Sequence, residues 1–152
     1  MKNRKKLSIY DIGAGNRYLK TLINFDGSAN FNLIDPNRNL EWAVENLKKN
    51  LKYPNNVKSF RCGIGNKSGK KNFYLAATST GSTFIDVYKN KNEINTKYFG
   101  EKNRIKVDIY NFKDFVKKFS LDKPDILKID TEGYEEKIVE PILNNYKPYL
   151  IE

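Results

Sequence analysis

Short apolar runs alternate with segments of helical periodicity along most of this chain. The expected strands are 7–12, 30–35, 57–64, 73–77, 104–110, 125–130 and 148–152. The expected helices have their apolar stripes at Leu19, Leu22 and Ile23, at Leu40 to Leu51 before Pro54, at Phe112 to Phe119, and after Tyr134, where Pro141 ends or kinks the helix. This repetition indicates an α/β fold with a mostly parallel sheet and helices on both faces.

Size and composition favour a globular protein with a single domain over 1–152. Hydrophobic residues make up 39% of the chain, yet no apolar run reaches the roughly 20 residues that a membrane helix needs. The single cysteine, Cys62, cannot form an internal disulfide, which is typical of a reducing compartment, so we expect the cytoplasm. Its place in an apolar strand indicates a small core residue.

The net charge of +10 would suit a nucleic-acid partner, but the lysines are scattered along the chain among many asparagines. Clustering on one face is the informative signal, so nucleic acid is the less favoured partner. The most polar segment, 89–104, has few apolar anchors and is predicted to be a mobile loop that orders when ligand binds.

Three aspartates end expected strands: Asp11, Asp35 and Asp130. In open α/β sheets, ligands bind beyond the carboxyl ends of the strands, where the strand order reverses. The sequence therefore predicts that the three acids meet at one rim of the sheet.

A glycine turn, "DIGAG", follows the first strand. Gly13 and Gly15 permit positive φ angles and a close approach to a ligand. A dinucleotide site would add a third glycine at position 18, which is Tyr18, and a phosphate loop of the Gly-Lys-Ser/Thr type is absent. Asp35, at the tip of the next strand, could accept hydrogen bonds from both hydroxyls of a ribose. A plain turn at each place stays open as the alternative.

Four segments together resemble the FkbM-type family of S-adenosylmethionine-dependent methyltransferases. They are "YDIGAGN", "LIDPN", "VKSFRCGIGNKSGKKNFYL" and, as the most specific block, "PDILKIDTEGYEEKIV". The resemblance runs from Ser8 to Glu152 and implies a Rossmann-like class I methyltransferase sheet that binds S-adenosyl-L-methionine. The implied cofactor-binding residues are Asp11, Gly13, Ala14 and Gly15 at the methionine end, Asp35 and Pro36 at the ribose, and Gly63 and Ile64 near the adenine.

The sequence departs from the family pattern in two places, at the glycine motif and at the C-terminal end. The glycine motif "GAGN" replaces the more frequent "GANxG", which leaves the path of the loop open. Family members usually continue past 148–152 through another helix and a closing pair of strands. We therefore expect an open sheet edge, covered by a partner or by a second copy of the chain.

Methyl transfer to a hydroxyl requires alignment and a proton acceptor. The chain has no histidine, so Asp130 is the first candidate base, and Glu132 is the second if the backbone stays extended. Lys128 is expected to point to the opposite face, Glu135 and Glu136 are expected to be first-turn helix acids, and no metal is expected.

The leading hypothesis is an S-adenosylmethionine-dependent methyltransferase that O-methylates a small molecule or a saccharide. One alternative is a degenerate or partner-dependent cofactor-binding module without activity of its own. A nucleic-acid-binding protein is the third hypothesis.

Overall fold

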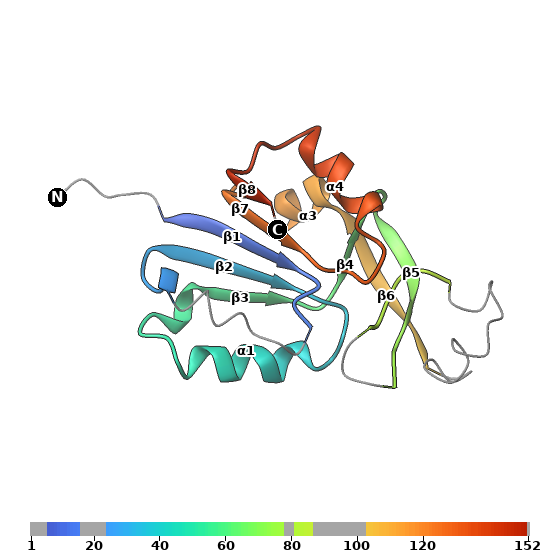
Figure 1. Cartoon of the computed structure of the whole chain (residues 1–152), viewed down its shortest axis with the longest axis horizontal. Coiled ribbons are helices and arrows are strands. Elements are labelled where there is room, and N and C mark those ends of the chain that lie inside the picture. The colour runs from blue at the N-terminus through green and yellow to red at the C-terminus, as the bar shows by residue number, and fades with distance from the viewer. Residues whose placement is uncertain (1–5, 16–23, 78–80, 87–102, 152) are drawn as a thin grey trace.

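A parallel sheet of five strands forms the centre of the computed structural model, which describes residues 6–15, 24–77, 81–86 and 103–151 (Figure 1). Its strand order is β3-β2-β1-β7-β8. The bounds are β1 Leu7–Ile12, β2 Ala29–Ile34, β3 Val57–Phe60, β7 Ile126–Ile129 and β8 Leu150–Ile151. The predicted α/β class with a mostly parallel sheet is confirmed.

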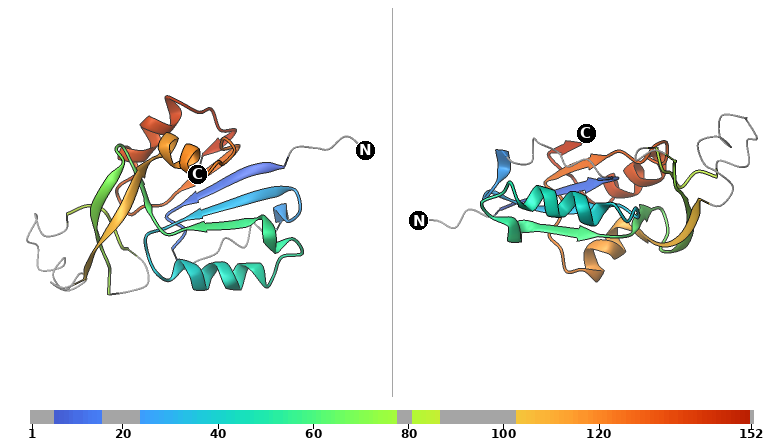
Figure 2. Two further views of the ribbon diagram at one scale, coloured as in Figure 1. Left: turned by 180° about the vertical axis from the view of Figure 1, so that it is seen from behind. Right: turned by 90° about the horizontal axis from the view of Figure 1, so that it is seen from below.

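A second sheet stands at the carboxyl ends of the parallel strands (Figure 2). It contains β4 (Gly63–Gly65), β5 (Gly69–Tyr74) and β6 (Arg104–Asn111). The middle strand, β6, pairs parallel with β4 and antiparallel with β5. This second sheet therefore lies beside the edge of the parallel sheet at which the sequence predicts ligand binding.

The single strand predicted over 57–64 is wrong, because the chain divides it between the two sheets. β3 ends at Phe60, and the Cys62 N–H donates to the Phe60 carbonyl at 3.0 Å, which turns the chain out of the parallel sheet. β4 then begins at Gly63. A Cβ at Gly63 would lie 2.3 Å from the Phe84 ring, so only glycine lets this ring cover the strand.

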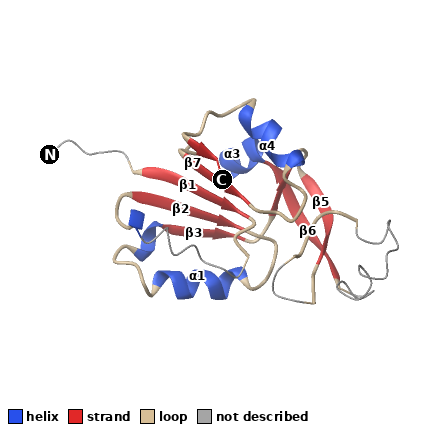
Figure 3. Ribbon diagram, in the orientation of Figure 1, coloured by secondary structure: helices blue, strands red, loops and turns tan. Residues whose placement is uncertain are grey.

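The described α-helices are blue in Figure 3. They bury residues of the apolar stripes expected from Leu40, from Phe112 and after Tyr134. Their bounds are α1 Leu40–Lys48, α3 Phe112–Lys118 and α4 Glu136–Leu143, with a short 3-10 turn at Pro54–Asn56. α1 ends before Leu51, which is nevertheless buried, and α4 continues through Pro141 to Leu143. The helix predicted around Leu19 lies outside the described residues.

Two apolar cores lie on opposite faces of the parallel sheet. Alternate residues such as Phe31 and Leu33 of β2 pack with α1, while Ile12 and Ile34 pack with α3, α4 and the second sheet. Odd and even strand positions therefore face different layers. In the described part of the chain, none of the helices has the length and apolar character to cross a membrane.

Candidate functional site

The carboxyl ends of β1, β2 and β7 bring the three predicted acids to one rim. These strands are neighbours in the order β2-β1-β7, so Asp35 and Asp130 flank the end of the strand that holds Asp11. The Asp130 N–H donates to the Ile12 carbonyl at 2.9 Å, which extends the pairing of β1 and β7 to the rim. The acids share this edge but differ sharply in exposure: the side chains of Asp11 and Asp130 are 1% and 63% exposed.

Lys128 lies among these acids, and its predicted position on the opposite face is wrong. Residues two apart on a strand share a face, so Lys128 and Asp130 project to the same side of β7. The ammonium lies 3.0 Å from the Asp11 carboxylate and 3.7 Å from that of Asp130. Asp11 and Lys128 are also direct partners in the register of β1 and β7. The sequence rule of alternation could have placed Lys128 beside Asp130.

Burial controls the protonation of Asp11. Removal from water raises the pKa of this carboxyl to about 6, although the Lys128 ammonium opposes the rise by attraction and hydrogen bonding. The negative charges of Asp130 and Asp35 add to the rise. Asp11 is therefore a buried carboxylate that depends on Lys128 for its charge balance.

Asp35 is buried at the tip of β2, where its carboxylate organises two turns. One oxygen accepts the Gly15 N–H at 2.8 Å and the other accepts the Asn37 N–H at 2.6 Å. Burial raises the pKa of Asp35, and these two N–H groups oppose that rise. The contact with the Asn37 N–H forms the local turn that the sequence left open as an alternative. The contact with the Gly15 N–H joins that turn to the glycine loop.

The glycine loop is fixed by its own backbone. The N–H groups of Gly13 and Ala14 both donate to the Ile34 carbonyl, at 2.8 and 3.2 Å. Gly13 has φ +84°, and a Cβ there would lie 1.8 Å from the Asp130 carbonyl oxygen. Gly15 has φ +55°, and a Cβ there would lie 3.9 Å from the Gly13 carbonyl oxygen, an ordinary contact. Gly13 is thus required for packing against the end of β7, whereas a Cβ at Gly15 meets no close contact among the described residues.

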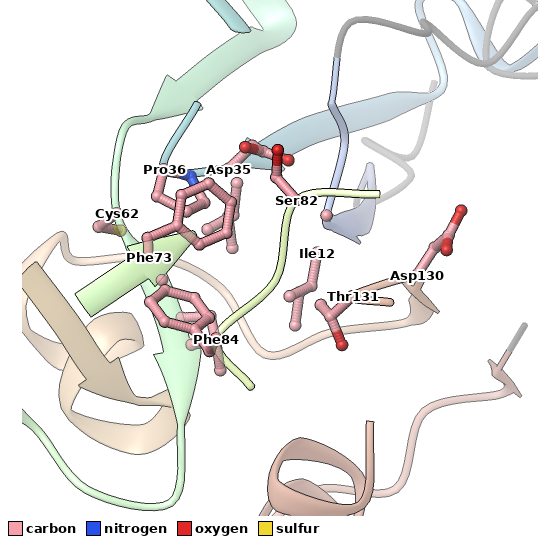
Figure 4. Close-up of a pocket in the computed structure, with 13 residues that line it drawn as sticks. Ile12, Asp35, Pro36, Cys62, Phe73, Ser82, Phe84, Asp130 and Thr131 are labelled. Atoms are coloured by element: carbon pink, nitrogen blue, oxygen red, sulfur yellow. The ribbon is translucent and has the colours of Figure 1, made fainter. Parts of the chain in front are cut away.

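A small pocket of about 30 Å³ lies next to this rim (Figure 4). It is lined by Gly13, Asp35, Pro36, Gly63 and Ile64 of the predicted cofactor-binding set, and by Asp130. The apolar lining includes Ile12, Ile34, Phe73 and Phe84. The structure therefore brings these predicted residues together, while Asp11, Ala14 and Gly15 lie outside the lining of this pocket.

The turn after β7 does not meet the condition set for Glu132. Glu132 has φ +54° and Gly133 has φ +92°, so the backbone is turned and not extended. Glu135 holds the turn: one carboxylate oxygen accepts the Thr131 N–H at 2.8 Å and the Gly133 N–H at 3.2 Å. Burial works against ionisation of Glu135, but these backbone N–H groups leave its pKa lowered. The positioning role of Glu135 was missed in the sequence, where it was expected only as a first-turn helix acid.

Other chemistry is sparse in the described residues. Burial raises the pKa of the Cys62 thiol to about 12, in keeping with its predicted place in the core. Within the described ranges, no three His, Cys, Asp or Glu side chains gather in a way that could hold a metal ion. The loop predicted over 89–104 lies outside the described residues as far as residue 102.

Fold and rim together define an α/β protein with three acids at the carboxyl ends of neighbouring parallel strands. The family model of the methyltransferase FkbM domain matches residues 11–152, and the chain belongs to this family. The fold is similar to the crystal structure of methyltransferase FkbM from Methylobacillus flagellatus KT, with a TM-score of 0.60 and 17% sequence identity. This similarity covers 96% of the present chain and 32% of that chain. A search of curated proteins finds no match.

Proposed function

We propose that this protein transfers a methyl group from S-adenosyl-L-methionine to a hydroxyl of a small molecule or saccharide. Membership of the FkbM methyltransferase family supports the reaction class. The observation that carries the proposal is the buried Asp35 carboxylate, which joins the glycine loop to the rim of an apolar pocket.

The residues present fit the adenosine part of this cofactor. Among the described residues, each Asp35 oxygen accepts one N–H, and a carboxylate has about four acceptor sites, so two are left in this part of the structure for the hydroxyls of a ribose. Pro36, Phe73 and Phe84 give the neighbouring pocket the apolar walls that an adenine ring requires. On this proposal Gly63 and Ile64 contact the adenine.

The pocket must widen to take a nucleoside. Its volume of about 30 Å³ is room for one or two water molecules. Ser82 and Phe84 lie on the segment 81–86, whose backbone pairs with β5 at the bridge between Thr83 and Tyr74. The Thr83 hydroxyl also donates to the Glu132 carbonyl at 3.0 Å. We expect this segment to move outward when the cofactor binds.

When bound, the cofactor supplies a methyl group on a positively charged sulfur, and the chain's own residues align the acceptor with it. Asp130 is the most exposed of the three rim acids and lines the pocket, so it is the group we assign to take the acceptor's proton. Asp11 is too buried for that role. Glu132 is a weaker candidate because of its turned backbone.

Methyl-labelled cofactor tests the reaction directly. The protein is incubated with the labelled cofactor and separate pools of small hydroxyl compounds and saccharides, and label in the acceptor fraction is counted. Transfer by the native chain that falls strongly in Asp130→Asn supports the proposal. Binding of the cofactor without transfer to any pool would favour a binding module without activity of its own.

A further inference from the structure

The glycine loop cannot offer its amides to an anionic ligand in this structure. The N–H groups of Gly13 and Ala14 are bonded to the Ile34 carbonyl, and that of Gly15 to the Asp35 carboxylate. The three loop amides that would ordinarily receive an anion are therefore already satisfied by the protein. Among the described residues, these three amides therefore leave no donor for a negatively charged part of a ligand at this edge.

Lys128 is the cation that the structure places among the rim acids. Its ammonium has three N–H donors, and among the described residues it makes one hydrogen bond, to Asp11 at 3.0 Å. Asp130 lies at 3.7 Å, which is an ion pair beyond hydrogen-bond distance. The side chain is 18% exposed, so part of it reaches solvent although its partner Asp11 is buried.

We propose that Lys128 binds the carboxylate of the cofactor's amino-acid end, using the N–H donors that Asp11 leaves over. This inference rests on the proposed function, since S-adenosyl-L-methionine carries an α-amino-acid group beyond its sulfur. Asp11 is buried and is the register partner of Lys128, so it holds the ammonium from the side of the sheet. The ligand carboxylate approaches the ammonium from the rim. The ammonium group of the same amino acid offsets the added negative charge among the acids.

Two nucleosides separate this inference from the proposed function. S-adenosylhomocysteine retains the amino-acid end, whereas 5′-methylthioadenosine lacks it, and both share the adenosine. Their affinities for the full chain are measured by titration calorimetry for the native protein, Lys128→Met and Lys70→Met. Lys70 on β5 is a matched control, because it forms an exposed pair with Asp108 on β6.

We expect Lys128→Met to weaken S-adenosylhomocysteine by about tenfold or more, the effect of a lost charged hydrogen bond, and to leave 5′-methylthioadenosine unchanged. Lys70→Met should change neither affinity. Equal weakening of both nucleosides, or of neither, would overturn the role of Lys128 while the proposed function stands. Failure of the native chain to bind either nucleoside would remove both.

Two further variants guard against loss of folding. Asp11→Asn combined with Lys128→Met removes the buried pair as a whole, so no charge is left without its partner. This double variant should also lose the preference for S-adenosylhomocysteine over 5′-methylthioadenosine, and Lys128→Arg should keep most of it. If the double variant preferred S-adenosylhomocysteine over 5′-methylthioadenosine by the same factor as the native chain, Lys128 would not bind the carboxylate.

Discussion

The ammonium of Lys128 lies 3.0 Å from the Asp11 carboxylate, although 117 residues separate the two in the chain. Parallel pairing of β1 and β7 sets this contact, because Asp11 and Lys128 are register partners. The pair joins the first strand to the strand that ends in Asp130. It therefore links the stability of the sheet to the geometry of the rim.

Loss of Lys128 should destabilise the fold. Lys128→Met leaves the buried Asp11 carboxylate without its cation, and removal of one partner of a buried pair costs about 3–5 kcal/mol. Asp11→Asn together with Lys128→Met should recover most of that loss, since the charge and its partner leave together. Urea unfolding of both variants at pH 7 measures the two free energies. Additive losses in the double variant would show that the residues do not interact.

Asp11 should make stability depend on pH in a defined window. Burial raises its pKa in the folded protein from 3.8 to about 6, so between these values the folded state binds the proton and the unfolded state does not. The stability of the fold that comes from proton binding by Asp11 is fully present below about pH 4. It is lost as the pH rises through 6. The loss is on the order of 3 kcal/mol, at 1.36 kcal/mol for each pKa unit.

Unfolding free energies from pH 4 to 7.5 test this window, with Asp11→Asn as the variant that cannot titrate. The native protein should lose stability relative to Asp11→Asn as the pH rises. Parallel curves for the two proteins would mean that Asp11 has an ordinary pKa in the fold.

The two loop glycines should respond unequally to alanine. Gly13→Ala places a methyl group against the Asp130 carbonyl at a positive φ, so we expect a loss of about 2–5 kcal/mol. Gly15→Ala makes no close contact with the described residues and should cost about 1–2 kcal/mol for its φ alone. Urea unfolding compares the two variants. An equal cost would mean that β7 does not press against the loop at Gly13.

Much of the rim followed from local sequence patterns. Asp35 and Asp130 each come directly after a short apolar run, and the glycine turn follows the strand that holds Asp11, so local order was enough to place them at one edge. What local order could not supply is the hydrogen bonding across the rim. The contact of Gly15 with Asp35 and that of Lys128 with Asp11 depend on which strands become neighbours.

The wrong predictions have separate physical causes. The segment 57–64 contains no Pro, Asn or Asp that would signal a turn, so the sequence does not mark the turn at Cys62 that moves the chain into a second sheet. Glu132 is a candidate base only on an extended backbone, and that condition fails, because the Glu135 carboxylate accepts the N–H groups of Thr131 and Gly133 and keeps that segment turned. Both features arise from contacts that strand and helix propensities do not describe.

Asp130 should affect turnover far more than cofactor binding. With an acceptor in hand, Asp130→Asn should lower kcat by roughly 10²–10⁴, the usual contribution of a general base, because the amide cannot take the proton. The affinity for S-adenosylhomocysteine should stay near the native value. Glu132→Gln serves as the comparison, with a smaller expected effect because of its turned backbone. Loss of binding in Asp130→Asn would make Asp130 a binding residue.

The ribose of S-adenosyl-L-methionine should bind to the Asp35 carboxylate. Titration calorimetry measures the affinity of S-adenosylhomocysteine for the native chain, for Asp35→Ala and for the control Asp114→Ala, whose aspartate lies on α3 and outside the lining of the pocket. We expect micromolar binding that Asp35→Ala weakens by about 1–3 kcal/mol, the cost of lost charged hydrogen bonds, while the control binds as the native chain does. No binding by the native chain, or equal affinity in Asp35→Ala, would contradict this role of Asp35.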